Sequence, residues 1–244
     1  MIQDVYQSKE IANQYHADRL SSGFRRYKHW MECYYLKKYI DTLNEPILDV
    51  GCGTGRITEY LLELGFKPTA TDDSAAMLDV FNKRLGKQKK IKTICTDITR
   101  LPFPDKKFAT VITIRVIWHL PHQKIKKALH ELSRVSSDSL VFDITNRQYS
   151  ESLLGKILLG IFSLRGMPRN SIYSQESEVS DILKKHKFVL HSKSNLESIP
   201  HLWLNLWPTA QIPLSLFKTA RLADKLFRFI LPPQRQLLFY TRVK

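Results

Sequence analysis

Cysteine, glycine and acidic side chains are scarce in this 244-residue sequence, and it contains no long apolar run. The three cysteines, Cys33, Cys52 and Cys95, are far apart, which argues against a zinc site or a disulfide framework and suits a reducing cytoplasm. The longest apolar segment, Leu153 to Leu164, contains Lys156 and is too short to cross a bilayer. The polar start, MIQDVYQSKE, does not resemble a signal peptide. We therefore expect a soluble, cytoplasmic protein without a metal centre.

The shortage of acids gives the chain a large positive charge. Lysine and arginine number 38 against 23 acids, for a formal charge of +15. Such a charge favours an anionic partner, either a nucleic acid or a membrane surface. The basic residues occur in short groups, such as 83–92 and 122–127, where helix ends and loops are expected. This placement is also typical of a solvated surface, so the charge alone does not identify a partner.

From Pro46 onwards, short apolar segments alternate with segments of helical periodicity. The pattern predicts strands at 47–50, 68–72, 91–96, 108–114 and 139–144, and helices at 55–64, 74–85 and 122–135. Alternation at this spacing predicts βαβ units and a doubly wound, mostly parallel sheet with helices on both faces. We expect one domain over 1–244, with a helical cap at 1–45, a cofactor-binding core at 46–146, and substrate or lid segments with closing strands at 147–244.

The segment ILDVGCGTGRIT, residues 47–58, places a glycine-rich turn between a strand and a helix. Glycines allow close approach to a ligand, and the following helix offers unpaired N–H groups. A dinucleotide fingerprint has a third glycine where this chain has Arg56, so a nicotinamide cofactor is disfavoured. Asp49 precedes the turn and would attract a cationic group. The predicted ligand is therefore a nucleoside that carries an ammonium or sulfonium group.

Two further strand ends carry acids. Asp72 ends the strand in TATDDSAAML, where a carboxylate can accept both ribose hydroxyls. Met77 follows it with a flexible side chain suited to an adenine face. Asp97, in TICTDI, can accept a hydrogen bond from an adenine amino group. A lone acid at such a position is usually a helix cap, but acids at three successive strand ends indicate one ligand site.

At this point the sequence resembles a known family. LDVGCGTG, TDDSAAML, TDITRLPFPDKKFATVI and IRVIWHL follow the motif order of the class I S-adenosylmethionine-dependent methyltransferases. The resemblance is to the small-molecule subgroup that includes the ubiquinone and menaquinone biosynthesis enzymes, and it covers mainly 1–145. It implies a Rossmann-like, seven-stranded α/β sheet with helical insertions late in the chain. It also implies S-adenosylmethionine as the cofactor.

The resemblance assigns roles residue by residue. It implies that the methionine part of the cofactor is bound by Asp49, Gly51, Gly53 and Gly55. Asp72 would hold the ribose, while the adenine would contact Met77, Asp97 and the backbone of Ile98. Tyr15 and Arg26 are the candidates for residues that close over the cofactor. The second acid in DDS, at 72–74, departs from the family pattern, which more often has an apolar residue there.

Two residues after the fourth strand are candidates for catalysis. A sulfonium methyl is already activated, so the protein mainly has to place the acceptor in line with it. Arg115 occupies the position that the family places near the transferred methyl, and it is bulkier than usual, which suits an anionic substrate. His119 could remove a proton from an acceptor hydroxyl at neutral pH. Alternatively, His119 caps the helix that begins near Pro121 or packs beside Trp118.

The segment 213–231 has the pattern of an amphipathic helix. Its basic positions are Lys218, Arg221, Lys225 and Arg228, and its apolar positions are Leu216, Phe217, Ala220, Ala223, Phe227 and Ile230. This pattern fits a helix lying in the interface of an anionic membrane. It equally fits a helix that packs on the sheet and exposes its basic side chains to water. In either case the late apolar segments could cover a lipophilic pocket.

The sequence therefore favours an S-adenosylmethionine-dependent methyltransferase. The expected acceptor is a small lipophilic molecule such as a quinone, an isoprenoid or a lipid-linked intermediate, met near the membrane surface. One alternative is an RNA methyltransferase, which is less favoured because no recognised RNA-binding module is present. A second alternative is a non-catalytic partner protein that binds the cofactor. The acceptor atom and the oligomeric state remain open.

Overall fold

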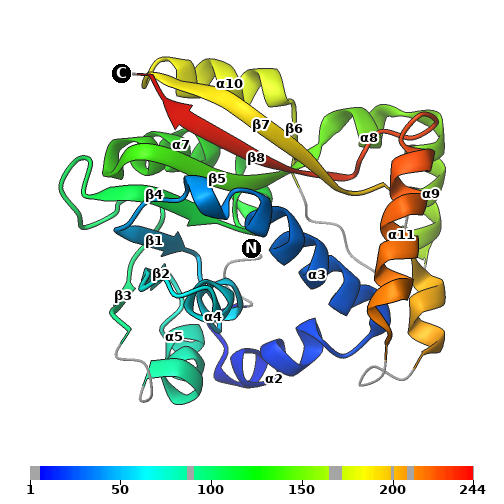
Figure 1. The fold of residues 1–244 in the computed structure, drawn as a ribbon, viewed down its shortest axis with the longest axis horizontal. Coiled ribbons are helices and arrows are strands. Elements are labelled where there is room, and N and C mark those ends of the chain that lie inside the picture. Colours follow the sequence, from blue (N-terminus) through cyan, green and yellow to red (C-terminus); the bar gives the residue numbers. More distant parts are fainter. Residues whose placement is uncertain (1–5, 87–90, 165–171, 199–200, 208–211, 244) are drawn as a thin grey trace.

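A single mixed β-sheet runs through the described part of the chain. The computed structural model describes residues 6–86, 91–164, 172–198, 201–207 and 212–243 (Figure 1). The sheet order is β3-β2-β1-β4-β5-β8-β7, and a short β6 also pairs with β5. The strands are β1 (Ile47–Val50), β2 (Thr69–Asp72), β3 (Thr93–Cys95), β4 (Phe108–Thr113), β5 (Ser136–Asn146), β6 (Tyr173–Ser174), β7 (Phe188–Glu197) and β8 (Arg235–Arg242).

The predicted mostly parallel, doubly wound sheet is confirmed. Strands β1 to β5 pair in parallel, whereas β8 runs antiparallel between β5 and β7. Seven strands form the main order, and the two-residue β6 adds an eighth that the sequence analysis did not anticipate. Because β8 pairs with both β5 and β7, this last strand lies inside the sheet and not at its edge.

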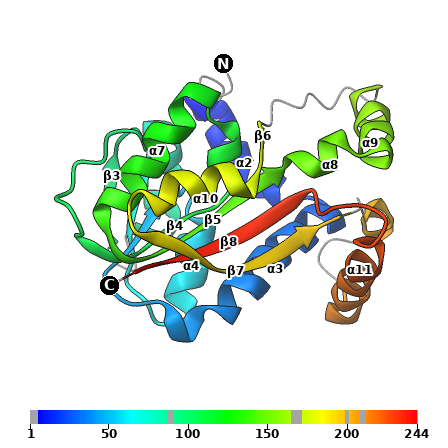
Figure 2. The ribbon, with the colours of Figure 1, turned by 90° about the horizontal axis from the view of Figure 1, so that it is seen from above.

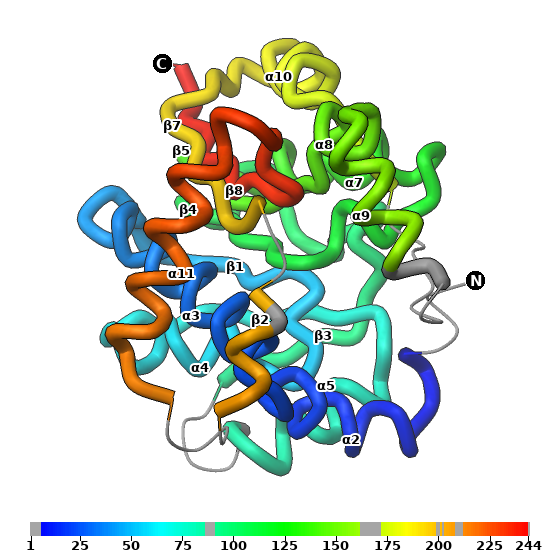
Figure 3. Tube along the Cα trace, turned by 90° about the vertical axis from the view of Figure 1, so that its right-hand side faces the viewer, coloured from blue at the N-terminus to red at the C-terminus, as the bar shows by residue number. Residues whose placement is uncertain are grey.

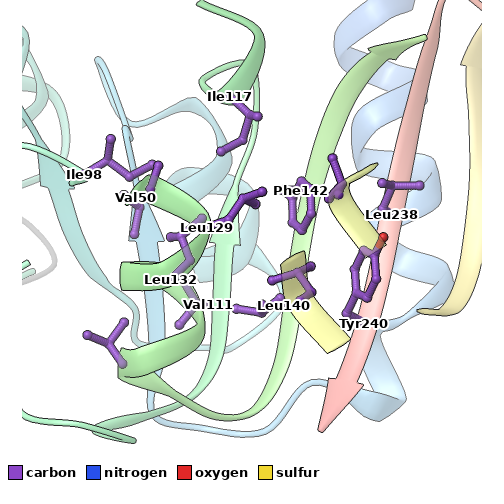
Figure 4. Close-up of a cluster of buried hydrophobic side chains, with 14 of the residues drawn as sticks. Val50, Ile98, Val111, Ile117, Leu129, Leu132, Leu140, Phe142, Leu238 and Tyr240 are labelled. Atoms are coloured by element: carbon purple, nitrogen blue, oxygen red, sulfur yellow. The ribbon is translucent and has the colours of Figure 1, made fainter. Parts of the chain in front are cut away.

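Helices cover both faces because side chains alternate along the central strands. Leu48 and Val50 of β1 join the cluster under α7 (His122–Val135) and α10 (Glu176–Lys184), whereas Ile47 faces α3 (Gly23–Lys38) and α4 (Arg56–Glu63). Figure 2 shows the sheet between these two helical layers. Figure 4 shows the first cluster, in which Leu129 and Leu132 of α7 pack toward the sheet. The remaining helical segments that follow the early strands are α5 (Ala75–Phe81), its π-helical continuation η2 (Asn82–Gly86) and the short η3 (Ile117–His119).

The N-terminal segment before β1 is mainly helical, and residues 1–5 of the predicted cap lie outside the described part. Helix α2 (Lys9–Arg19) begins at Ser8 and α3 begins after Ser22, and each serine hydroxyl accepts a hydrogen bond from the first turn. Ala12 of α2 packs on Ala76, Met77 and Val80 of α5. The short turn η1 (Ile40–Thr42) then leads to β1. The cap thus places α2 next to the carboxyl end of β2.

The late segments gather at the end of the molecule toward which β5 runs. They are α8 (Arg147–Glu151), α9 (Leu153–Leu164), η4 (Leu202–Leu206) and α11 (Leu214–Phe227). Figure 3 views this end and shows α9 and α11 on opposite sides of it. Residues 165–171 and 208–211, within these predicted late segments, lie outside the described part of the chain.

The predicted apolar face of α11 is only partly correct. Phe217 and Ala220 are buried, but Phe217 packs on Tyr27 and Trp30 of α3 and not on the sheet. Phe227 and Ile230, which were expected on the same face, are 43% and 70% exposed. The buried residues of α11 are therefore those near α3, and the residues at and after its last turn extend beyond this contact.

Candidate active site

A cavity opens where the first four strands end. It has an empty volume of about 700 Å³, including its open mouth, which is in the range of small-molecule sites. Its walls come from the turns after β1 to β4 and from the N-terminal segment. The lining residues include Tyr6, Tyr15, Gly51, Gly53, Asp72, Asp73, Met77, Thr96, Ile98, Arg115, Val116 and His119. Most of the residues predicted from the sequence are thus brought together.

The glycines of the first turn have three different surroundings. All of them have positive φ, +70° at Gly51, +56° at Gly53 and +90° at Gly55. A Cβ on Gly53 would first meet Tyr15 at 3.8 Å, so this backbone faces the cavity. A Cβ on Gly51 would lie 2.3 Å from Val116. Gly53 therefore leaves the room for a ligand beside the backbone, as the glycine motif predicts.

Gly55 has a packing role instead of the predicted cofactor contact. It is not among the residues that line the cavity, and a Cβ there would lie 2.6 Å from Phe81 and 2.7 Å from Leu85. The missing side chain lets α4 begin close against α5 and its continuation. This glycine therefore fixes the position of the helix.

Asp72 lies at the centre of the polar wall of the cavity. Its Oδ2 accepts a hydrogen bond from the Gly53 N–H at 2.7 Å, and its Oδ1 accepts one from the Ser74 N–H at 2.9 Å. Burial raises the pKa of this carboxyl to about 6. Each oxygen keeps a second lone pair, so two ligand hydroxyls can still donate to it. Asp72 thus connects the glycine turn to α5 and remains able to bind a ribose.

Asp49 lies behind the glycine turn. It is 1% exposed, and its Oδ2 accepts a hydrogen bond from the Thr58 hydroxyl at 2.5 Å. Burial raises the pKa of this carboxyl to about 6. Asp49 lines a smaller adjoining cavity, which shares Tyr15, Gly51, Gly53 and Arg115 with the main one. The prediction that Asp49 lies near the cationic end of the ligand is therefore compatible with its place in this smaller cavity.

Two other predicted contacts are not brought to the cavity. Asp97 points to Lys124, with its Oδ2 at 3.1 Å from Nζ, and its Oδ1 accepts a hydrogen bond from the Thr99 N–H. Its neighbours Thr96 and Ile98 line the cavity instead, because successive side chains of an extended segment point to opposite sides. Arg26 lies on α3 and does not line the cavity. These two assignments are therefore not supported by the geometry.

The N-terminal residues closest to the cavity include two that the sequence analysis missed. The Ser74 hydroxyl donates to the carbonyl of Tyr6 at 2.6 Å, which holds Tyr6 against the turn after β2. Arg19 stacks over the ring of Tyr15, with 4.6 Å between guanidinium and ring centroid. The spacing offered a signal for Arg19, because it follows the predicted Tyr15 by four residues on one helix face. No comparable signal marked Tyr6.

His119 borders the cavity in its neutral form. Neither of its ring nitrogens has a hydrogen-bond partner among the described residues, although both nitrogens are buried and the residue is half-buried. Burial and the nearby positive charge of Arg19 lower its pKa to about 4. The ring stacks at 3.9 Å on Trp118 and lies edge-on to Tyr6. Packing beside Trp118, one of the alternatives from the sequence, is therefore observed, and two imidazole nitrogens still remain for a ligand.

Arg115 is held by acids from distant parts of the chain. Its Nε donates to Glu32 Oε1 at 2.6 Å, and its backbone N–H donates to Asp143 Oδ1 at 2.6 Å. The backbone adopts a left-handed φ of +65°, which is uncommon for a residue with a side chain. Burial lowers the pKa of the guanidinium to about 10, so it stays charged at neutral pH. Arg115 thus contributes a fixed positive charge to the cavity wall.

Glu32 is the centre of a buried ionic cluster that the sequence analysis missed. Besides Arg115, it accepts from Arg56 Nη1 at 2.6 Å and from Arg235 Nη2 at 2.8 Å. Arg235 also binds Asp143, whose Oδ2 accepts from the Trp118 indole at 3.1 Å. The three arginines hold the pKa of the Glu32 carboxyl well below its usual range, despite burial. The cluster connects α3, α4, β5 and β8 behind the cavity.

These surroundings fit S-adenosylmethionine. A buried carboxylate with free lone pairs suits the ribose, and the apolar side chains of Met77 and Ile98 suit a purine. The space beside Gly53 accommodates a chain that runs past the turn toward Asp49. Among the described residues, no group of three or more histidine, cysteine, aspartate or glutamate side chains is arranged to hold a metal ion.

Comparison with known proteins agrees with this reading. Residues 47–138 match a family described as a methyltransferase domain. The chain carries a class I S-adenosylmethionine-dependent methyltransferase domain. This match includes the first four strands, the glycine turn and Asp72. It confirms the family predicted from the motifs.

Individual relatives place the domain in a broad group. An uncharacterised methyltransferase of Bacillus subtilis, YodH, is 32% identical over 105 residues, 43% of this chain and 44% of that protein. A demethylmenaquinone methyltransferase of Tropheryma whipplei is 32% identical over 106 residues, 43% of each chain. The chain thus spans about half the length of the curated relatives it matches.

The fold similarity extends over almost the whole chain. Magnesium protoporphyrin IX methyltransferase from Synechocystis PCC 6803, solved with bound SAH, has a TM-score of 0.68. The alignment covers 99% of this chain and 98% of that chain at 14% identity. At this identity the likeness shows the fold alone. It extends over the late helices and closing strands of both chains.

Proposed function

We propose that this protein transfers a methyl group from S-adenosylmethionine to a small, lipophilic acceptor. The observation that carries the proposal is the chemistry of the cavity. One part is built for a ribose, around Asp72 and Gly53, and another presents the partnerless imidazole of His119 beside the charge of Arg115. When bound there, the cofactor would supply an electrophilic methyl group on its sulfonium. The protein then has to bind, orient and desolvate the acceptor.

The described residues can perform these tasks without a strong base. The low pKa of His119 keeps its imidazole neutral, so at neutral pH it can accept a hydrogen bond from an acceptor hydroxyl. Arg115 stabilises negative charge on the acceptor oxygen, because it is buried and held by Glu32. Orientation by these two side chains is the expected main source of catalysis. The aromatic rings of Tyr6 and Tyr15 exclude water from this side of the cavity.

Exposed apolar side chains on the late helical segments support a lipophilic acceptor that is met at a membrane. On α9 and the end of α11, Leu153, Leu226, Phe229 and Ile230 are 79%, 61%, 82% and 70% exposed. Lys225 directly precedes Leu226, Arg228 lies between Leu226 and Phe229, and basic side chains attract anionic lipids. No helix in the described ranges is long and apolar enough to span a bilayer. We propose peripheral contact through 213–231 at the cytoplasmic membrane surface.

The first experiment uses S-adenosylmethionine labelled on the methyl group. Purified protein is incubated with extract from its own host, and solvent-soluble, RNA and protein fractions are counted separately. Label in the solvent fraction, absent with Asp72→Asn, is the expected result. Label in RNA would favour the alternative RNA methyltransferase. Bound cofactor with no label in any fraction would favour a non-catalytic partner protein.

The membrane proposal has its own test. The native protein should float with phosphatidylcholine vesicles that contain phosphatidylglycerol, and Phe229→Ser with Ile230→Ser should remain behind. Both side chains are exposed, so these substitutions should leave the fold intact. Matched substitutions at exposed positions elsewhere, such as Val189→Ser, serve as the control. If the native protein stays with the unbound fraction, the membrane contact is wrong.

A further inference from the structure

A second cavity lies between α3, β7 and α11. It has an empty volume of about 830 Å³, including its open mouth, and its described lining residues are all different from those of the methyl-transfer cavity. Side chains of Tyr34, Tyr35 and Lys38 line it from α3, and those of Arg221 and Lys225 from α11. Of the four basic positions that the sequence analysis grouped on this segment, Arg221, Lys225 and Arg228 line the cleft together with Lys38 of α3 and Lys193 of β7.

The lining of this cleft is strongly cationic. It includes five basic side chains, namely Lys38, Lys193, Arg221, Lys225 and Arg228. The acidic residue in its described lining is Asp224. Like charges that converge in a concave site repel each other and raise the local concentration of anions. Arg221 is half-buried, and Lys38, Lys193, Lys225 and Arg228 reach the cleft from exposed positions, so an anion in the cleft would meet basic side chains from α3, β7 and α11.

Asp224 does not neutralise the cleft, because its carboxylate serves other donors. Its Oδ1 accepts from the Ser198 N–H at 2.8 Å, and its Oδ2 accepts from the Tyr27 hydroxyl at 2.7 Å. His201 Nε2 is also 3.0 Å from Oδ2. The residue is only 6% exposed. Its carboxylate is therefore engaged by α3 and by the segment after β7, and the single negative charge leaves the cleft with a positive balance against five basic side chains.

Two of the basic groups are already positioned by aromatic rings. The guanidinium of Arg221 lies over the Tyr34 ring, 4.3 Å from its centroid, and the ammonium of Lys38 lies 5.9 Å from the centroid of Tyr35. Stacking fixes the plane of a guanidinium and leaves its N–H edges for an acceptor. Lys193 is paired with Glu176 at 2.7 Å, so it contributes less. Arg221 is therefore the expected anchor of the site.

We infer that this cleft binds a phosphate group. Phosphate oxygens accept hydrogen bonds from several directions, which matches donors arriving from three separate elements, and arginine binds phosphate through two parallel hydrogen bonds. The phosphate has two possible sources, a soluble phosphate ester or the headgroup of a lipid. The inference does not depend on the proposed methyl transfer, because the two cavities are lined by different residues.

The test measures binding of inorganic phosphate to the full chain by calorimetry. The double variant Arg221→Gln with Arg228→Gln should weaken binding about 100-fold or more, because each charged hydrogen bond is worth about tenfold or more. Lys126→Gln with Lys127→Gln removes the same charge from exposed positions on α7 and should leave binding within about twofold. Thermal unfolding of each variant without phosphate checks that the fold is intact.

A second arm identifies the source of the phosphate. Vesicles of phosphatidylcholine with and without phosphatidylglycerol are added in the presence or absence of inorganic phosphate. Flotation that phosphate competes away, and that the arginine variant loses, assigns the site to a lipid headgroup. Phosphate binding without such competition assigns it to a soluble ester. Equal weakening in both double variants, or no phosphate binding by the native protein, overturns the inference.

Discussion

The Nε of Arg115 donates a hydrogen bond to Oε1 of Glu32 at 2.6 Å, across 83 residues of sequence. Glu32 is fully buried on α3, and Arg115 lies in the turn after β4. The pair therefore connects the N-terminal cap to the wall of the methyl-transfer cavity. A buried carboxylate shared by three arginines is stable only while all partners are present, because each ion has lost its hydration.

Glu32→Gln is expected to be strongly destabilising. The amide keeps the shape of the side chain but leaves Arg56, Arg115 and Arg235 without their shared negative charge. The free energy of unfolding should fall by roughly 3–5 kcal/mol, the usual cost of removing one partner of a buried ion pair. Chemical denaturation measures this, with the exposed Glu10→Gln as control. A loss no larger than that of the control would contradict the role assigned to Glu32.

Gly55→Ala and Gly65→Ala separate backbone strain from packing. Both glycines have nearly the same φ, +90° and +92°, but a Cβ on Gly55 would meet Phe81 at 2.6 Å, whereas one on Gly65 would meet no atom within 4 Å. Alanine at 65 should cost about 1–2 kcal/mol from strain alone. Alanine at 55 should cost about 1–3 kcal/mol more, because the core is overfilled. Denaturation curves that coincide for the two variants would remove the packing role of Gly55.

Asp72→Asn is expected to weaken binding of S-adenosylmethionine. The amide retains one oxygen acceptor but loses the charge that the ribose hydroxyls and the Gly53 N–H donate to. Hydrogen bonds to charged groups contribute about 1.5–3 kcal/mol, so affinity should fall about 10- to 100-fold in calorimetry. Asp79→Asn, at an exposed position on α5, is the matched control. Unchanged affinity in Asp72→Asn would refute the placement of the ribose.

The raised pKa values of Asp49 and Asp72 should affect protein stability and cofactor affinity in opposite directions. Burial raises the pKa of Asp49 and Asp72 from 3.8 to about 6, so ionisation of either carboxyl opposes folding. These two carboxyls should therefore contribute a decrease in the free energy of unfolding of the cofactor-free protein as the pH rises from 3.8 to about 6, whereas the lowered pKa of His119 contributes an increase. Affinity should rise over the same interval, because the ionised carboxylate is the better acceptor. Calorimetry at several pH values measures both quantities, and the difference between the native protein and Asp72→Asn isolates the contribution of Asp72.

His119→Ala should lower the turnover rate and leave cofactor binding intact. The imidazole faces the acceptor part of the cavity and is not needed for the ribose contacts. Loss of a positioned acceptor group should reduce kcat by about 100-fold, with cofactor affinity within about threefold. With saturating substrates, the native kcat should stay constant down to pH values near the pKa of His119, about 4. A decline near the ordinary histidine pKa of 6.5 would show that His119 is not buried in the working enzyme.

The sheet and much of the site could be predicted because they depend on local patterns. Apolar strands that alternate with amphipathic helices specify the parallel part of the sheet, and the strand ends then place Gly53 and Asp72 in one cavity. Asp97 was misplaced because a shift of one residue in an extended segment reverses the direction of the side chain. Its neighbours Thr96 and Ile98 face the cavity instead.

Other features depend on tertiary packing that no local pattern encodes. Arg26 was predicted to close over the cofactor and Arg19 was missed, because the sequence does not show which side of the N-terminal helices faces the strands. The ionic cluster around Glu32 draws its members from residues 32, 56, 115, 143 and 235, which have no common motif. The face of α11 was misjudged in part because α3, and not the sheet, covers it.

The position of β8 inside the sheet has a consequence for protein synthesis. Arg235 neutralises both Glu32 and Asp143, yet it emerges from the ribosome long after the elements that carry them. Until then neither acid has its full set of partners, and both remain hydrated in the nascent chain. The elements from α3 to β7 therefore cannot complete their packing around Glu32 and Asp143 until β8 has been synthesised. The insertion of one late strand between β5 and β7 then closes the interior of the protein.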